Sequence, residues 1–233
     1  MGNPYFSFKQ FTVFHDKCGM KVGTDGTTLG AWASCPDSVA ELQILDVGTG
    51  SGLIALMMAQ RFPVAEITAI DLDADAVSQA MENVAASPFA SRISVLECPL
   101  AAFAAKHENA FDCMVCNPPF FVQSLECPDE KRTKARHTSS LSFEELAQSA
   151  FRLLKCHGTL SVIVPADGLS LMDGAAALAH LFARRRCLLK TSPKKPAKRV
   201  LLEYGREPAP CFEDKELVLS SEDYRLMTQD FYL

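Results

Sequence analysis

The chain of 233 residues is long enough for one large α/β domain, and its 48% hydrophobic content can fill a substantial core. The formal net charge of −5 gives no general attraction for nucleic acid, so binding of RNA or DNA would require a local basic patch. Nine cysteines without a regular framework indicate reduced thiols in a cytoplasmic protein, and we expect no metal site. No apolar run reaches about 18 residues, so we expect no contact with membranes.

Residues 1–38 precede the first apolar run, and we expect them to form an N-terminal cap beside the substrate site. From residue 39 to residue 233, apolar runs alternate with helical patterns, which is typical of a single α/β domain on a parallel sheet. We therefore expect a Rossmann-like fold, with a mostly parallel seven-stranded sheet and helices on both faces. The expected strands span residues 42–47, 66–71, 92–97, 111–116, 159–165, 187–191 and 199–205. The expected helices span residues 52–62, 73–86, 101–106, 142–156, 167–184 and 221–231.

A glycine-rich loop, Asp46-Val47-Gly48-Thr49-Gly50-Ser51-Gly52, joins the first expected strand to its helix. Glycines let the backbone approach a ligand closely, and the helix N-terminus offers unpaired N–H groups. Leu53 stands where a dinucleotide motif requires a small residue, and the Gly-Lys-Ser/Thr of a phosphate-binding loop is missing. Asp46 would repel a phosphate but tolerates the ammonium and sulfonium of S-adenosylmethionine. The loop resembles that of class I S-adenosylmethionine-dependent methyltransferases, and we expect Asp46, Gly48, Gly50 and Gly52 at the cofactor.

Acidic residues end the next two expected strands. Asp71 is placed to accept hydrogen bonds from the ribose hydroxyls of the cofactor, although alone it would serve equally well as a helix cap. Glu97 ends the third strand, where the resemblance implies an Asp or Asn at the adenine amino group. Glu97 departs from that pattern but still offers a hydrogen-bond acceptor.

The tetrapeptide Asn117-Pro118-Pro119-Phe120 follows the fourth expected strand. An exocyclic amino group is a poor nucleophile, and two acceptors aimed at its hydrogens free the nitrogen lone pair. The Asn117 side-chain oxygen, beside the cofactor, and the Pro118 carbonyl suit this task, while the prolines add rigidity and no competing donor. Phe120 can stack on a planar substrate, so that methyl transfer depends on positioning and desolvation. The motif resembles that of methyltransferases acting on adenine, cytosine, guanine or glutamine amides, and does not choose among them.

The combined motifs resemble the bacterial valine-tRNA adenine-N6 methyltransferase family over essentially the full chain. The segments that carry this resemblance are residues 14–15, 20–26, 46–52, 117–121, 135–137 and 230–232. The resemblance implies methylation of adenosine at position 37 of tRNA(Val), with S-adenosylmethionine as the cofactor. It also implies that the segment with Lys21 and Thr24 closes over the cofactor, with Lys21 meeting its carboxylate.

Two basic clusters are compatible with a tRNA partner, because they would contact phosphates and position a flipped base. The first lies in the segment after the tetrapeptide and contains Lys131, Arg132, Lys134 and Arg136. The second lies between Arg184 and Arg206, where nine Lys and Arg residues accompany one acid, Glu203. Its proposed RNA-binding members are Lys194, Lys195, Lys198 and Arg199. Each cluster would also fit an ordinary solvated surface.

Three alternatives remain open at this stage. A ribosomal-RNA guanine-N2 methyltransferase shares the tetrapeptide type but usually carries a duplicated domain, for which 233 residues leave no room. A protein glutamine-N5 methyltransferase normally has Tyr where this chain has Phe120. A silent cofactor-binding or RNA-binding scaffold would not need the intact Asn117 motif.

Overall fold

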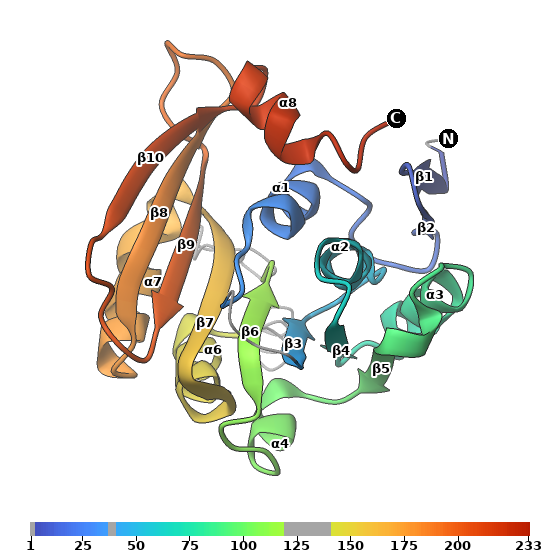
Figure 1. The fold of residues 1–233 in the computed structure, drawn as a ribbon, viewed down its shortest axis with the longest axis horizontal. Helices are drawn as coiled ribbons and strands as arrows, with labels where there is room; N and C mark the ends of the chain where they lie inside the picture. Colours follow the sequence, from blue (N-terminus) through green and yellow to red (C-terminus); the bar gives the residue numbers. More distant parts are fainter. Residues whose placement is uncertain (1–2, 37–40, 119–140) are drawn as a thin grey trace, which may run out of the picture.

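The computed structural model of the chain describes residues 3–36, 41–118 and 141–233, in which one sheet lies between two layers of helices (Figure 1). The sheet has the strand order β10-β8-β9-β7-β6-β3-β4-β5. Its strands are β3 Leu42–Val47, β4 Ala65–Asp71, β5 Ile93–Glu97, β6 Phe111–Cys116, β7 Leu154–Pro165, β8 Phe182–Lys190, β9 Arg199–Gly205 and β10 Glu213–Val218. Only β9 runs antiparallel to its neighbours β7 and β8, so the mostly parallel sheet is confirmed.

The sheet has eight strands, and the expected count of seven is wrong because β10 was missed. β10 begins Glu213-Asp214-Lys215-Glu216, so it lacks the alternation of apolar residues that identifies a strand. Ion pairs with the neighbouring strand hold it in place instead, since Asp214 pairs with Arg186 and Glu216 pairs with Lys190 of β8.

The helices form two layers with separate apolar clusters. Helices α1 Thr24–Trp32, α2 Leu53–Arg61, α3 Ala74–Ala85 and α8 Glu222–Thr228 lie on one face, and α4 Leu100–Ala104, α6 Phe143–Leu153 and α7 Leu169–Leu178 lie on the other. Every residue of α2 from Leu53 to Ala59 is buried, because the helix packs between α1 and the sheet. The alternation of strands and helices therefore predicted the layers correctly.

Two helices begin at side-chain caps. The Asp73 side chain accepts a hydrogen bond from the Asp75 amide at 3.0 Å, and Ser142 accepts one from the Glu145 amide at 3.1 Å. These caps fix where α3 and α6 begin.

Two expected helix ends are wrong. We expected a helix to residue 184, but α7 ends at Leu178 because His180 adopts a left-handed φ of 59° and the Leu181 amide turns back to the Ala176 carbonyl at 2.9 Å. We also expected a helix to residue 156, but α6 ends at Leu153 and β7 begins at Leu154, so that Gly158 lies inside β7. A Cβ at Gly158 would come within 2.9 Å of the Phe111 carbonyl oxygen, so the glycine allows β7 to approach β6 closely.

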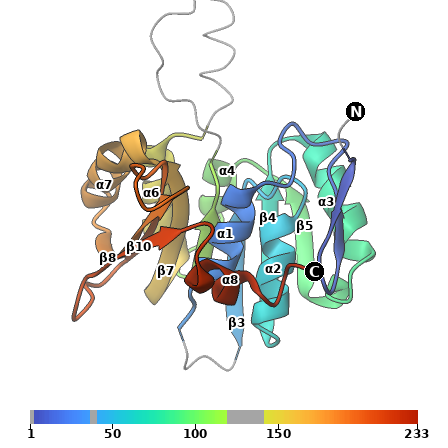
Figure 2. The same cartoon turned by 90° about the horizontal axis from the view of Figure 1, so that it is seen from above.

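The N-terminal segment forms a hairpin of β1 Tyr5–Ser7 and β2 Thr12–Phe14 beside α3 (Figures 1 and 2). Asn83 of α3 exchanges hydrogen bonds with both backbone groups of Phe14 and also donates to the Ser51 carbonyl at 2.8 Å. The C-terminus joins the same layer, since the Lys9 amide donates to the Phe231 carbonyl at 2.9 Å. Both chain ends thus brace the helix layer that supports the glycine-rich loop.

Across the described ranges, no helix combines the length and the apolar character needed to cross a membrane.

Candidate active site

Parallel pairing of β3 with β6 brings the two principal motifs together. Val47, the last residue of β3, is the register partner of Cys116, the last residue of β6. The residues that follow, Gly48 and Asn117, therefore leave the sheet side by side at its carboxyl edge. In open α/β sheets, ligands bind in the crevice at this edge.

The glycine-rich loop turns sharply over the end of β3. Gly50 has a φ of 55° and Gly52 a φ of 80°, a left-handed conformation that other residues rarely adopt. The Gly50 amide donates to Oδ2 of Asp71 at 2.8 Å, and the Gly48 amide donates to the Ile70 carbonyl at 2.9 Å. The end of β4 thus fixes the shape of the loop.

Asp46 holds the loop from below and is completely buried. Its Oδ2 accepts hydrogen bonds from the Thr49 hydroxyl at 2.6 Å and from the Ala55 amide at 3.1 Å. Its Oδ1 is buried and has no hydrogen-bond partner among the described residues. Burial raises the pKa of Asp46 to about 7, assisted by the charge of Asp71, whereas the two hydrogen bonds act in the opposite direction.

A cavity of about 410 Å³ lies between the loop, the first turn of α1 and Asn117. Its wall combines backbone of the glycine-rich loop with both charged and apolar side chains. The lining residues are Met20, Lys21, Val22, Gly23, Thr24, Asp25, Gly26, Gly48, Thr49, Gly50, Ser51, Leu53, Ile54, Asn117 and Arg199. Five of the residues predicted at the cofactor therefore share one cavity: Lys21, Thr24, Gly48, Gly50 and Asn117.

Asn117 is one of the residues that line this cavity. Its Oδ1 atom is buried and has no hydrogen-bond partner among residues 3–36, 41–118 and 141–233. An unpaired buried acceptor costs free energy, which a bound donor would recover. Asn117 is thus equipped to accept a hydrogen bond from a ligand.

Four predicted cofactor residues do not line the cavity: Asp46, Gly52, Asp71 and Glu97. The two oxygens of Asp71 accept hydrogen bonds from the Gly50 and Asp73 amides, so this carboxylate shapes the loop and also begins the turn into α3. Glu97 is exposed and lies beside Asp71 in the register of β4 and β5. Their contacts with a cofactor remain predictions.

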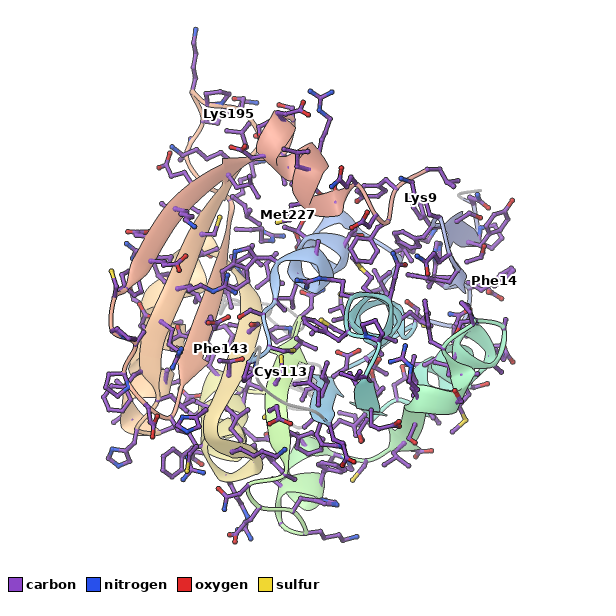
Figure 3. All side chains as sticks on the ribbon, in the orientation of Figure 1. Lys9, Phe14, Cys113, Phe143, Lys195 and Met227 are labelled. Carbon is purple, nitrogen blue, oxygen red and sulfur yellow. The ribbon has the colours of Figure 1, made fainter. Side chains whose placement is uncertain are left out.

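The other predicted catalytic and RNA-binding residues fall into three groups. Residues 119–140 lie outside the described part of the chain, and they include Pro119, Phe120, Lys131, Arg132, Lys134 and Arg136. Lys194, Lys195 and Lys198 are exposed in the β8–β9 loop, where Lys195 extends away from the body (Figure 3). Arg199 instead pairs with Asp25 at 2.7 Å on the cavity wall.

Most other basic side chains near this loop are engaged within the protein. Arg185 pairs with the buried Glu203 at 2.6 Å, while Arg186 and Lys190 pair with acids of β10. The basic cluster read from the sequence is therefore much smaller as a free charged surface than its composition indicates.

Sequence reasoning missed Asp25. Its partner Arg199 lies 174 positions away in the chain, and no local pattern relates the two residues. Only the tertiary structure, which brings the first turn of α1 to the start of β9, could reveal the pair.

Comparison with known proteins agrees with this geometry. A family model described as the methyltransferase small domain matches residues 33–191. A tRNA1(Val) (adenine(37)-N6)-methyltransferase of Phocaeicola vulgatus is 50% identical over 100% of this chain and 99% of its own length. The chain belongs to the tRNA1(Val) (adenine(37)-N6)-methyltransferase family. A member from Tolumonas auensis is 40% identical over 100% of this chain and 98% of its own length.

Solved structures support the fold of this family member. A protein of Agrobacterium tumefaciens described as a predicted O-methyltransferase has a TM-score of 0.69 and 19% sequence identity. The match covers 89% of this chain and 96% of that chain. The Rossmann-like methyltransferase fold is therefore confirmed.

Metal ligands were not expected from the sequence. The described residues contain no group of three His, Cys, Asp or Glu side chains suited to hold an ion.

The buried carboxylate gives a prediction for stability. Because the pKa of Asp46 rises from 3.8 to about 7 on folding, the native protein keeps a proton that the unfolded chain releases in this range. The contribution of this proton to the free energy of unfolding is complete below about pH 4 and is lost as the pH rises through about 7. From about pH 5 to about pH 8, the ligand-free protein should lose on the order of 2–3 kcal/mol relative to Asp46→Asn. Urea unfolding of both proteins across this range measures the difference, and parallel pH profiles would contradict the prediction.

Proposed function

We propose that this protein transfers the methyl group of S-adenosylmethionine to N6 of adenosine 37 in tRNA1(Val). The observation that carries the proposal is the position of Asn117, with its unpaired buried acceptor, in the cavity under the glycine-rich loop. Relatives of this name at up to 50% identity over the whole chain supply the identity of the substrate. The reduced thiols expected from the sequence fit a cytoplasmic enzyme.

The residues present fit S-adenosylmethionine. The unpartnered Oδ1 of Asp46 lies at the base of the loop. A cationic ligand nearby would favour the ionised form of Asp46, whose negative charge in turn stabilises the cation. Backbone of Gly48 and Gly50 would approach the ligand, and Lys21 and Thr24 would face its carboxylate. Gly52 would shape the loop, and Asp71 and Glu97 would serve the ribose and the adenine. When bound, the cofactor supplies a methyl group made electrophilic by the sulfonium.

Asn117 and Pro118 would bind the adenine amino group. The Oδ1 of Asn117 and the carbonyl oxygen of Pro118 would each accept a hydrogen bond from one N–H of this amino group. These hydrogen bonds oppose delocalisation of the nitrogen lone pair into the ring. Held in this geometry, the amino nitrogen is a better nucleophile. After methyl transfer the nitrogen carries one proton too many, and it loses that proton. Pro119 would stiffen the backbone and Phe120 would stack on the base.

The remaining segments have complementary tasks in this proposal. Residues 1–38 would form the cap over cofactor and substrate, and residues 39–233 the methyltransferase domain. The exposed Lys194, Lys195 and Lys198 would contact tRNA phosphates, together with the predicted cluster Lys131, Arg132, Lys134 and Arg136. The β8–β9 loop suits contact with tRNA because it leads directly into Arg199 on the cavity wall.

Replacing Asn117 tests the proposed chemistry. Asn117→Ala should lower kcat for methyl transfer to tRNA about 100-fold or more, because the amino group loses a positioned acceptor. The affinity for S-adenosylmethionine, measured by calorimetry, should stay within a few-fold. Asn117→Gln provides a matched variant that retains the amide but displaces it, and it should also lose most activity. Parallel loss of cofactor binding in both variants would instead assign Asn117 a structural role.

Neutralising the loop lysines tests the RNA surface. In Lys194→Gln/Lys195→Gln/Lys198→Gln, tRNA should bind more weakly, and the slope of log affinity against log salt should shrink by about two. Lys106→Gln/Lys215→Gln is the control, since these exposed lysines lie outside the β8–β9 loop, and its slope should match that of the wild type. An unchanged slope in the triple variant would place the loop away from RNA.

A further inference from the structure

An ion pair on the cavity wall joins the first turn of α1 to the start of β9. Oδ2 of Asp25 accepts a hydrogen bond from Nε of Arg199 at 2.7 Å. Asp25 lies in the first turn of α1, and Arg199 is the first residue of β9, so the pair joins two elements far apart in the chain. Both side chains are about one-third exposed, and both line the cavity.

The next residue, Gly26, lies against the catalytic motif. A Cβ built on Gly26 would come within 3.1 Å of Cδ2 of Leu53 and 3.9 Å of Nδ2 of Asn117. The first turn of α1 therefore forms part of the wall that holds the Asn117 amide. Any shift of this turn would change the space around Asn117.

The other end of α1 has separate anchors. Arg61 donates to the Gly30 and Ala33 carbonyls at 2.8 and 2.7 Å, and Arg185 lies 4.1 Å from the ring centroid of Trp32. At the N-terminus, Gly23 provides no side-chain cap. The Asp25–Arg199 pair thus acts on the N-terminal end of the helix, where the Thr28 hydroxyl also shares a hydrogen bond with the Tyr224 hydroxyl of α8 at 3.3 Å.

We propose that the Asp25–Arg199 ion pair is a positioning device, which holds the first turn of α1 against Asn117 so that its amide is oriented for catalysis. The inference rests on the proposed methyltransferase function and assigns Arg199 an intramolecular role in place of the predicted phosphate contact. Neither residue is a catalytic residue in this account, because they act through the position of Asn117.

A double-mutant cycle on Asp25→Asn and Arg199→Gln tests this role. Each single variant should lower kcat about 10- to 100-fold, since small displacements of a catalytic group have effects of this size. The double variant should be no slower than either single variant. The Kd for tRNA and its salt dependence should match those of the wild type, because the positioning role involves no phosphate contact.

Two structural readouts locate the effect. Hydrogen exchange at the Thr27 amide, which donates to the Gly23 carbonyl at 3.3 Å, should accelerate in both single variants. The emission of Trp32, the single tryptophan of the chain, should be unchanged because its own anchors remain. Asp214→Asn is the matched control, since it breaks the Arg186–Asp214 pair on β8 and β10 and should leave kcat unchanged.

The inference is overturned if Arg199→Gln weakens tRNA binding and flattens its salt dependence while Asp25→Asn leaves kcat intact. Additive effects on kcat in the double variant would also overturn it. The proposed function is tested separately, by measuring whether the wild-type protein transfers methyl groups to tRNA. Should the wild type transfer no methyl group to tRNA, unchanged exchange at Thr27 in Asp25→Asn would still contradict the positioning role.

Discussion

The parallel pairing of β3 with β6 is the contact on which the whole site depends. Because Val47 and Cys116 are register partners at the ends of these strands, the glycine-rich loop and Asn117 leave the sheet at neighbouring points. A slip of one residue would turn the side chains of β6 to the opposite faces and move Asn117 away from the cavity. The register is secured by burial, since every residue of β6 is buried and Cys113 and Cys116 enter different apolar clusters.

Asp46 adds a second constraint at the same point. A completely buried carboxylate with one unpaired oxygen destabilises the ligand-free protein at neutral pH, yet it fixes the loop through Thr49 and Ala55. Local conflicts of this kind are expected at functional sites, where a ligand completes the missing interaction. The unpaired Oδ1 of Asn117 presents the same arrangement for the substrate. The Asn117 acceptor therefore lines the cavity itself, whereas the unpaired Asp46 oxygen lies outside the cavity lining, at the base of the glycine-rich loop.

Sequence patterns predicted the part of the fold that obeys local rules. The strands β3 and β6 are mostly apolar runs, and α3 and α6 begin at side-chain caps, so these elements were visible in the sequence. β10 was not visible, because ion pairs to β8 replace apolar alternation. The end of α7 was missed because His180 supplies a left-handed turn normally made by glycine. Of the site, the loop and Asn117 follow from motifs, whereas the Asp25–Arg199 pair depends on tertiary packing alone.

The most direct test of the account is to identify the methylated nucleoside. The purified protein would be incubated with a radioactive methyl donor and RNA from a strain that lacks it, and the RNA would then be separated and digested. The account predicts N6-methyladenosine in tRNA1(Val), lost with Asn117→Ala. N2-methylguanosine in ribosomal RNA, or the absence of label from tRNA, would contradict it.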